Sequence, residues 1–400
     1  MGGDAFDTRI QEAARKDGPV SSLPRTVLYT VCFSDFYGTQ RNVFAAARRL
    51  DPNRYRPIVA APEGDFFNVL KESGIAAIPL PFKGVADFST ALALRRIIRD
   101  NKVSLVHAHL GISAVLSLLA SGMAGGVPVI ATRHFIDHRY STIKNKLLYN
   151  VYRLLYIGMN ARLKRVIFVS EAVRRGVESR EGSLGDRGVV IYNSVDLSEG
   201  LNRLNMAAGD IEVLKAAFGA PPGCFLVVTL SRLVAEKRID TLLEAAAALK
   251  EKGGRYFFLI AGDGPLRCEL EEKAGRLGVR DSVRFLGYVK EARELAAAAD
   301  AFALPAEAEP FGIAVIEAMA AGTPVVAARA GGPLEIINEG VNGLFFSPGD
   351  SIDLAEKLST LAGDSVLRNS IAVNARTRAG DFDEREIALK IQYVYDQVLG

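Results

Sequence analysis

The sequence predicts an α/β protein built from two doubly wound domains, and three observations lead to this fold class. The chain has 400 residues, a length that suggests two or three domains. Apolar residues make up 49% of the chain and charged residues 24%, which is the balance of a globular protein with a large core. In both halves, short apolar runs alternate with longer helical patterns, as in sheets whose parallel strands are joined by helices.

The predicted strands are the apolar runs that turn residues interrupt. Those of the first half are 27–33, 55–60, 105–108, 127–132, 166–169 and 189–192. Those of the second half are 224–230, 256–261, 283–286, 301–304 and 324–327.

The same pattern gives the expected domain boundaries. The first domain spans 25–196, after a mobile extension at 1–24. The second spans 197–380, and its first part, 197–223, contains the linker and ends in a Pro-Pro-Gly turn. Residues 381–400 form a C-terminal helix with one apolar face, which consists of Ile387, Ile391, Val394 and Val398.

Charge is distributed unevenly between the two halves. Residues 1–196 contain 27 Lys and Arg against 17 Asp and Glu, a net charge of +10, and the remainder has 22 against 29, a net charge of −7. Residues 138–170 contain seven Lys or Arg, with Tyr149, Tyr152 and Tyr156 interleaved, and no acidic residue. This segment is either a solvated helical face or a contact for anionic lipid headgroups. The slight overall basicity disfavours nucleic acid as a partner.

The sequence gives no sign of a targeting or membrane-spanning segment. Residues 1–24 are acidic and lack an apolar run, so they do not resemble a secretory signal. Residues 110–132 are uncharged, but Gly125-Gly126 and Pro128 divide them into a helix, a turn and a strand. Three cysteines without a CxxC pair favour a reducing cytoplasm.

The common nucleotide-binding motifs are absent. After the strand 256–261, the run Gly262-Asp263-Gly264-Pro265-Leu266-Arg267 has an arginine where a dinucleotide fingerprint has its third glycine. No GxxxxGK[ST] phosphate loop occurs either. These absences disfavour hydride transfer and P-loop ATPase chemistry.

Two carboxylates follow the strand 301–304. Glu309 is expected in a turn, with Pro310 opening a helix that Gly322 and Pro324 end. Glu317 lies inside that helix among apolar neighbours, at the edge of the sheet where such folds bind ligands. It could accept hydrogen bonds from a ribose diol, while Glu309 contacts a second hydroxylated group; alternatively, both are ordinary surface carboxylates.

Basic residues and a glycine pair follow two other strands. Arg232 and Lys237 stand five residues apart after the strand 224–230, where side chains and helix amides can neutralise a diphosphate. Gly331-Gly332 follow the strand 324–327 and would let backbone approach a phosphate or sugar closely. Solvated loop residues and a plain turn are the alternative interpretations.

With these motifs, the chain resembles the retaining glycosyltransferases of family 4, which have the GT-B fold of two Rossmann-like domains facing across a cleft. The resemblance rests on E-P-F-G-I-A-V-I-E, S-R-L-V-A-E-K, A-G-D-G-P-L, V-R-F-L-G-Y-V, A-G-T-P-V-V-A, G-G-P-L-E-I-I and N-G-L-F-F-S-P-G-D, in order between Ser231 and Asp350. It is looser in the first half, through V-H-A-H-L, A-T-R-H, F-V-S-E-A-V and I-Y-N-S-V-D. The family also implies that the C-terminal helix packs back on the N-terminal domain.

The resemblance implies a role for each matching position. Arg232 and Lys237 would bind the donor diphosphate, Glu317 the ribose, and Glu309 the transferred sugar; with His109, the two basic residues and Glu309 form the catalytic set. The remaining positions would bind the nucleotide sugar: Gly38 in the first loop, His134, the backbone at Tyr288 and Val289 beside the base, Gly312, and the amides of Gly331 and Gly332. One departure is that only Gly38 remains where the family often has a glycine pair.

The four histidines, His107, His109, His134 and His138, fall within 32 residues. They could ligate zinc if the two segments met, but strand alternation places His107 and His109 on one face, where hydrogen bonding to sugars fits better. The family resemblance implies that no metal or cofactor is required. His107 could also be a satisfied core residue.

The function expected from the sequence is transfer of a sugar from a nucleotide diphosphate sugar to a hydroxyl acceptor, with retention of configuration. A lipid-linked or polysaccharide acceptor at the cytoplasmic membrane face is expected from the basic segment 138–170. The alternatives are a catalytically silent sugar-nucleotide-binding subunit and a GT-B sugar-nucleotide epimerase.

Overall fold

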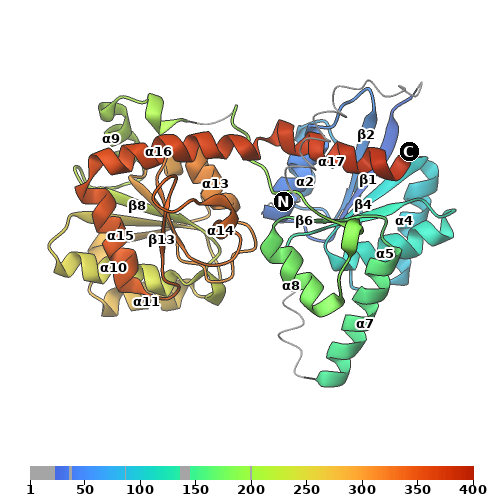
Figure 1. Ribbon diagram of the computed structural model, residues 1–400, viewed down its shortest axis with the longest axis horizontal. Coiled ribbons are helices and arrows are strands. Elements are labelled where there is room, and N and C mark those ends of the chain that lie inside the picture. Colours follow the sequence, from blue (N-terminus) through green and yellow to red (C-terminus); the bar gives the residue numbers. More distant parts are fainter. Residues whose placement is uncertain (1–22, 36–37, 86, 136–144, 199–200) are drawn as a thin grey trace. The chain divides into compact units, whose positions relative to one another are not determined.

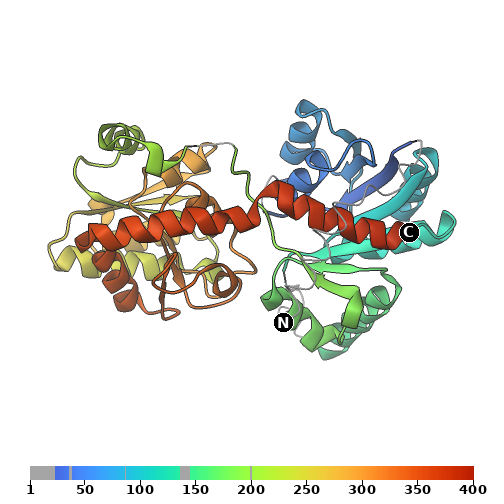
Figure 2. The ribbon, with the colours of Figure 1, turned by 45° about the horizontal axis from the view of Figure 1, so that its top comes forward.

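The computed structural model describes residues 23–35, 38–85, 87–135, 145–198 and 201–400 (Figure 1). The chain divides into two compact units, one formed by 1–194 with 384–400 and the other by 195–383. Each contains one parallel sheet with helices on both faces (Figures 1 and 2). The two Rossmann-like domains expected from the apolar runs are confirmed. The extension predicted for 1–24 lies almost entirely outside the described residues.

The sheet of the first unit has the strand order β3-β2-β1-β4-β5-β6-β7. Because the chain moves outward from β1 first through β2 and then through β4, the order reverses between β1 and β4. The strands are β1 (Arg25–Val31), β2 (Tyr55–Ala61), β3 (Ala76–Pro79), β4 (Val103–His109), β5 (Val129–Arg133), β6 (Val166–Phe168) and β7 (Gly188–Val190). The helices are α2 (Gly38–Arg48), α3 (Asp65–Glu72), α4 (Phe88–Asp100), α5 (Gly111–Met123), α7 (Lys146–Arg162), α8 (Glu171–Glu181) and α17 (Glu384–Leu399).

The second unit has the order β10-β9-β8-β11-β12-β13, which reverses between β8 and β11. Its strands are β8 (Phe225–Leu230), β9 (Tyr256–Ala261), β10 (Val283–Gly287), β11 (Ala301–Leu304), β12 (Val325–Ala328) and β13 (Leu344–Phe346). Its helices are α9 (Ala208–Ala217), α10 (Ile239–Glu251), α11 (Arg267–Arg276), α12 (Ala292–Ala298), α13 (Ile313–Ala320), α14 (Pro333–Ile336), α15 (Ser351–Gly363) and α16 (Ser365–Ala379). The segment expected to contain the linker therefore includes a helix, α9.

The central strands of the second sheet are apolar on both faces because helices cover both. Val227 and Val228 of β8 and Phe302 and Ala303 of β11 are all fully buried, and Phe302 pairs with Val228 in the register of these strands. Removing such side chains from water provides much of the free energy of folding. Each unit has its own apolar cluster.

The C-terminal helix α17 belongs to the core of the first unit, as expected. Ile387, Ile391 and Val394 of its apolar face are buried in the same cluster as Val27 and Val59 of the sheet. In the middle of this face, Tyr395 is fully buried. The helix therefore completes the first domain although it follows the second in the sequence.

Among the described residues, no helix is both long enough and apolar enough to cross a membrane. The uncharged segment 110–132 folds as predicted into α5, a turn with positive φ at Gly125 and Gly126, and β5.

Candidate functional site

The candidate site of the second unit lies where its strand order reverses. Residues 231–238 follow β8 and residues 305–312 follow β11, and these neighbouring parallel strands end at the same edge of the sheet. Open α/β sheets bind ligands outside the carboxyl ends of the strands, at such a reversal. The predicted Arg232, Lys237 and Glu309 all lie on these two loops.

An ion pair joins the two loops. Lys237 Nζ donates to Glu309 Oε2 at 2.6 Å, and the two side chains are 20% and 14% exposed. A charge-assisted bond of this length between partly buried groups is among the stronger polar contacts in proteins. The structure therefore brings together the residue predicted to bind the diphosphate and the residue predicted to face the transferred sugar.

The loop that follows β8 is a tight turn. Ala235–Lys237 form one turn of 3-10 helix, and Arg238, in the left-handed conformation with φ of 48°, precedes α10. The Arg238 guanidinium pairs with Asp240 at 3.2 Å and also with Glu307, which holds this uncommon conformation in place. Arg232 is exposed, and within the described part of the chain its guanidinium has no hydrogen-bond or ion-pair partner, so it remains available to an anion.

The loop that follows β9 supports the loop that bears Arg232. A Cβ atom on Gly262 would lie 1.9 Å from the Ser231 carbonyl oxygen, and one on Gly264 would lie 2.5 Å from that of Leu233. The Leu233 amide donates to the Asp263 carbonyl at 3.0 Å. Sequence reasoning tested this glycine run only as a dinucleotide fingerprint and missed this positioning role. The sequence signal for this role is a Gly-x-Gly run directly after β9, the strand that adjoins β8.

The Gly331-Gly332 pair packs against the loop that carries Glu309. A Cβ atom on Gly331 would lie 2.3 Å from the Glu309 carbonyl oxygen, and one on Gly332 would lie 2.2 Å from the Phe311 Cα. The Gly332 amide donates to the Glu309 carbonyl at 2.8 Å. The Gly332 amide is therefore bonded within the protein, and the pair fixes the backbone position of Glu309. That the two glycine amides lie beside the sugar donor stays a prediction.

The helix that carries Glu317 begins later than predicted. Pro310 does not open it, because Gly312 has a φ of 109° and serves as the N-cap of α13, which starts at Ile313. A left-handed residue cannot continue a right-handed helix, so the helix starts after Gly312. Glu317 lies about one turn into α13, as predicted, and is partly exposed between fully buried neighbours.

Tyr288 and Val289 follow β10, two strands away from β8 at the same edge of the sheet. Tyr288 is 62% exposed and Val289 is partly exposed. Their predicted packing on a nucleotide base is compatible with this exposure and remains a prediction.

In the first unit, Gly38 is the first residue of α2, and Phe36 and Tyr37 of the same loop lie outside the described residues. His109 and His134 lie close together at the ends of β4 and β5, with His109 Nδ1 at 2.8 Å from His134 Nε2. They are 0% and 7% exposed, so both are buried rather than lining an open surface. His109 Nε2 is buried and has no hydrogen-bond partner among the described residues.

His107 is a satisfied core residue, one of the two interpretations that the sequence left open. Its Nδ1 lies 2.6 Å from the Tyr395 hydroxyl and its Nε2 lies 2.7 Å from Thr132 Oγ1. Tyr395 donates to Tyr29, so the Tyr395 oxygen accepts the Nδ1 proton of His107, and Thr132 donates to Nε2.

Burial keeps the histidines of the first unit neutral. Desolvation lowers the pKa of His107 and that of His134 to about 3, and it lowers the pKa of His109 well below its usual value. The repulsion that a protonated His134 would exert on a protonated His107 further lowers the pKa of His107. Each imidazole is therefore uncharged near neutral pH, with one ring nitrogen that can donate a hydrogen bond and one that can accept.

Within the described ranges, no group of three His, Cys, Asp or Glu side chains is arranged to hold a metal ion. His138, the fourth histidine of the zinc alternative, lies outside those ranges. The three cysteines are free thiols.

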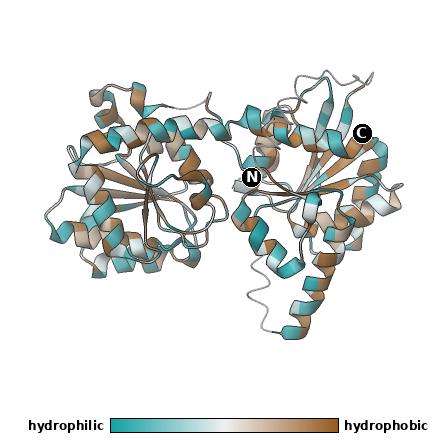
Figure 3. Cartoon of the chain, viewed as in Figure 1, coloured by the Kyte–Doolittle hydropathy of each residue, from teal (hydrophilic) through white to brown (hydrophobic). Residues whose placement is uncertain are grey.

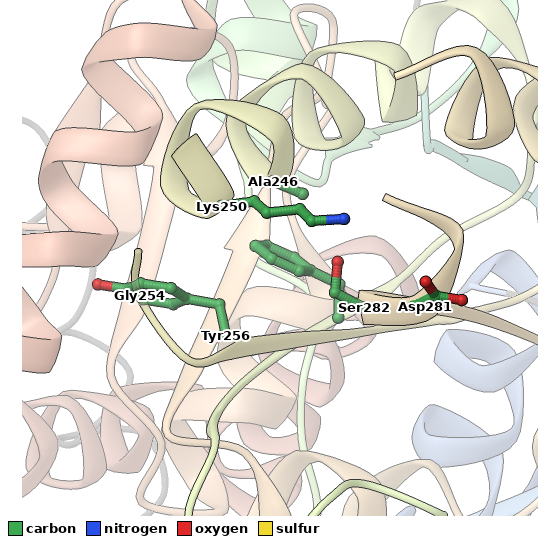
Figure 4. A pocket seen from close by; sticks show the side chains of 7 residues that line it. Ala246, Lys250, Gly254, Tyr256, Asp281 and Ser282 are labelled. Carbon is green, nitrogen blue, oxygen red and sulfur yellow. The ribbon is translucent and has the colours of Figure 1, made fainter. Parts of the chain in front are cut away.

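A cavity elsewhere in the second unit takes no part in this site (Figure 4). It is lined by Lys250, Tyr256, Asp281 and Ser282, among others, near the amino-terminal ends of β9 and β10, opposite the edge that bears Lys237. The Lys250 ammonium donates to the Gly278 carbonyl at 2.5 Å.

Comparison with known proteins agrees with the fold. Residues 210–378 match the family model "Glycosyl transferases group 1", and residues 36–199 match "Glycosyltransferase Family 4". The structure of HepE from Anabaena in complex with UDP has a TM-score of 0.80 and 25% identity, over 93% of this chain and 100% of that one.

Relatives of similar sequence carry glycosyltransferase names. The phosphatidyl-myo-inositol mannosyltransferase of Mycobacterium leprae is 31% identical over 80% of this chain and 82% of its own length. An uncharacterized glycosyltransferase of Methanocaldococcus jannaschii is 33% identical over 53% of this chain, and this match spans only 54% of that relative's length.

The two Rossmann-like domains and the two family matches define a glycosyltransferase of the GT-B fold class. The chain belongs to glycosyltransferase family 4, whose second domain is the group 1 module.

Proposed function

We propose that this protein transfers a sugar from a nucleotide diphosphate sugar to a hydroxyl acceptor and retains the anomeric configuration. The observation that carries the proposal is the Lys237–Glu309 ion pair at the strand-order reversal, with the unpaired guanidinium of Arg232 on the same loop. A diphosphate leaving group gathers negative charge as the sugar carbon becomes cation-like, and preorganised cations stabilise that charge. The UDP and UDP-glucose complexes of HepE support a nucleotide-sugar donor.

The proposal gives the individual residues the roles that the family resemblance implies. Arg232 and Lys237 neutralise the diphosphate, and Glu317 on α13 accepts hydrogen bonds from the ribose. Glu309 contacts the hydroxyls of the transferred sugar. The backbone at Tyr288 and Val289 packs on the base. For His109, His134 and Gly38 of the first unit, donor contacts are proposed from the family resemblance alone, because both histidines are buried.

Family membership and the properties of the site support the proposal of retention. Glu309 is already held by Lys237 and is proposed to bind sugar hydroxyls rather than to attack the anomeric carbon. The acceptor hydroxyl would attack from the face that the diphosphate leaves, and a donor phosphate oxygen would take its proton. The proposal includes no metal and no cofactor.

The experiment that tests this proposal is product analysis with purified protein, a nucleotide sugar and candidate acceptors. A glycoside with the anomeric configuration of the donor is the expected product. An inverted product would refute retention. An altered nucleotide sugar formed without an acceptor would identify an epimerase, and binding without turnover would identify a silent subunit. The Lys237→Ala variant should lose most turnover and keep the fold.

We further propose a lipid-linked or polysaccharide acceptor and a cytoplasmic location, at the inner face of the membrane when the acceptor is engaged. The supporting observations are the basic segment 138–170, the three free cysteines and a relative named for a phosphatidylinositol substrate. Flotation with anionic vesicles tests the membrane contact.

A further inference from the structure

The helix α7 has an apolar face that the rest of the first unit does not cover. Its first three turns carry large apolar side chains that are 36–74% exposed: Leu147, Leu148, Val151, Leu154 and Leu155. At 100° per residue these five positions fall within an arc of about 120°. Figure 1 shows α7 extending from the body of this unit, and Figure 3 shows apolar residues along it.

The opposite face of α7 anchors the helix. Tyr156 packs over the start of α5 so closely that a Cβ atom on Gly111 would lie 2.1 Å from its ring. Asn160 donates to Glu181 at 2.7 Å, and Glu181 pairs with Arg133 at 2.8 Å in a buried network. The Asn145 side chain caps the first turn by accepting from the Leu147 and Leu148 amides. The exposed apolar face is therefore held on a capped helix that is fixed at its other end.

The basic residues around this face differ from the expected set of seven. Arg139 and Lys144 lie outside the described residues, Arg153 donates to the Arg180 carbonyl, and Arg165 donates to the Asp186 carbonyl. The exposed cations that have no partner in the described structure are Lys146, Arg162 and Lys164. Segment 138–170 has no acidic residue, so the charged side chains that α7 itself carries are all positive.

We infer that the apolar face of α7 inserts into the interface of an anionic lipid membrane, with Lys146, Arg162 and Lys164 contacting the headgroups. An interfacial helix needs only its apolar face to enter the headgroup boundary, by about 5–10 Å. The face is about 12 Å long, too small to supply the roughly 800 Å² that a stable protein interface takes from each partner. The inference rests on the proposed function, since it names the surface through which a lipid-linked acceptor would be reached. It makes insertion of the apolar side chains, rather than charge attraction, the main contribution to the free energy of membrane binding.

The absence of tryptophan from the chain allows a site-specific test. A full-length V151W variant carries one fluorophore on the apolar face, and V366W, at a 79% exposed position on α16, is the matched control. With vesicles of phosphatidylcholine and phosphatidylglycerol, the emission of V151W should shift to shorter wavelength and that of V366W should not. Unchanged emission of V151W would overturn the inference.

Flotation of a triple variant separates insertion from simple charge attraction. L147S/V151S/L154S should lower partitioning into the anionic vesicles about tenfold or more, whereas V213S/V366S/V373S, changed at exposed positions of the second unit, should float like the wild type. Equal flotation of the first variant and the wild type would contradict the inference, as would self-association of the wild type that this variant abolishes.

A thermal-shift assay with UDP, GDP and ADP keeps the two proposals apart. The L147S/V151S/L154S variant should keep any nucleotide-induced rise of the wild type, which shows that it is folded. Vesicle binding by a protein that responds to no nucleotide would refute the proposed function and leave the insertion of α7 standing; the reverse result would refute only the insertion.

Discussion

The ion pair between Lys237 and Glu309 predicts an unusual response to substitution of Glu309. In the proposed function, the donor diphosphate competes with Glu309 for the Lys237 ammonium. The Glu309→Gln variant removes this competitor, so it should bind a nucleoside diphosphate more tightly than the wild type does. Because the variant also loses its contact with the transferred sugar, it should transfer sugar more slowly.

The size of this effect follows from the geometry of the pair. Two unit charges about 4 Å apart at an effective dielectric constant of about 20 attract by about 4 kcal/mol, and the desolvation of both groups offsets much of this. Exposed pairs contribute about 0–1 kcal/mol, and this pair is 20% and 14% exposed, so about 1–2 kcal/mol is expected. Since 1.4 kcal/mol corresponds to tenfold in affinity, the variant should bind about 5–30-fold more tightly.

Isothermal titration calorimetry with UDP, GDP and ADP measures this change for the nucleotide that the wild type binds. Glu236→Gln is the matched control, because it removes the same charge from an exposed position of the Lys237 loop that has no ion-pair partner among the described residues. Equal tightening by both variants would assign the effect to net charge alone. Unchanged or weaker binding by Glu309→Gln would refute the competition.

Two further predictions concern the Glu309 loop and the buried histidines. Gly331→Ala should lower transfer activity at least about tenfold and destabilise the second unit by about 1–3 kcal/mol, because its Cβ would meet the Glu309 carbonyl. The control Gly340→Ala, with a similar φ of 73° and open space around its Cβ, should lose stability through backbone strain alone. Equal transfer activity of the two variants would contradict the role of Gly331 in positioning Glu309. The folded-state pKa of His107 is about 3, below its unfolded value near 6.5, so the unfolded chain binds the extra proton and stability is lost as pH falls from about 6.5 toward 3, by about 1.4 kcal/mol per pH unit. In urea unfolding between pH 7 and pH 5, His107→Gln should show a smaller loss than the wild type, and an equal loss would mean that His107 is charged when folded.

Most strands could be predicted because buried parallel strands are continuous apolar runs. The range 256–261 matches β9 and 301–304 matches β11. Two strands were missed for physical reasons. β3 is an edge strand whose residues are only partly buried or exposed. The apolar run of β13 ends with its third residue, whereas the apolar runs of the equally short β6 and β7 continue beyond the strand.

The candidate site was predictable only in part, because its residues meet across long stretches of sequence. The positions of Arg232, Lys237 and Glu309 followed from the ends of their strands, but a pairing between residues 72 apart depends on which strands are neighbours. The role of the Gly331-Gly332 pair depends on close approach to Glu309 and Phe311, which sequence spacing does not encode. The apolar face of α7 was overlooked because Leu147 and Leu154 have the same spacing as residues that pack into a core.

The central claim is that the loops after β8 and β11 bind a nucleotide diphosphate sugar, and a thermal-shift screen tests it most directly. Ligands that bind only the folded state raise its apparent stability. Purified wild type and Lys237→Ala are screened against UDP, GDP, ADP and their sugars. The wild type should be stabilised selectively by one nucleotide series, and Lys237→Ala should lose most of that stabilisation. No stabilisation of the wild type by any nucleotide at saturating concentration, or equal stabilisation of both proteins, would contradict the claim.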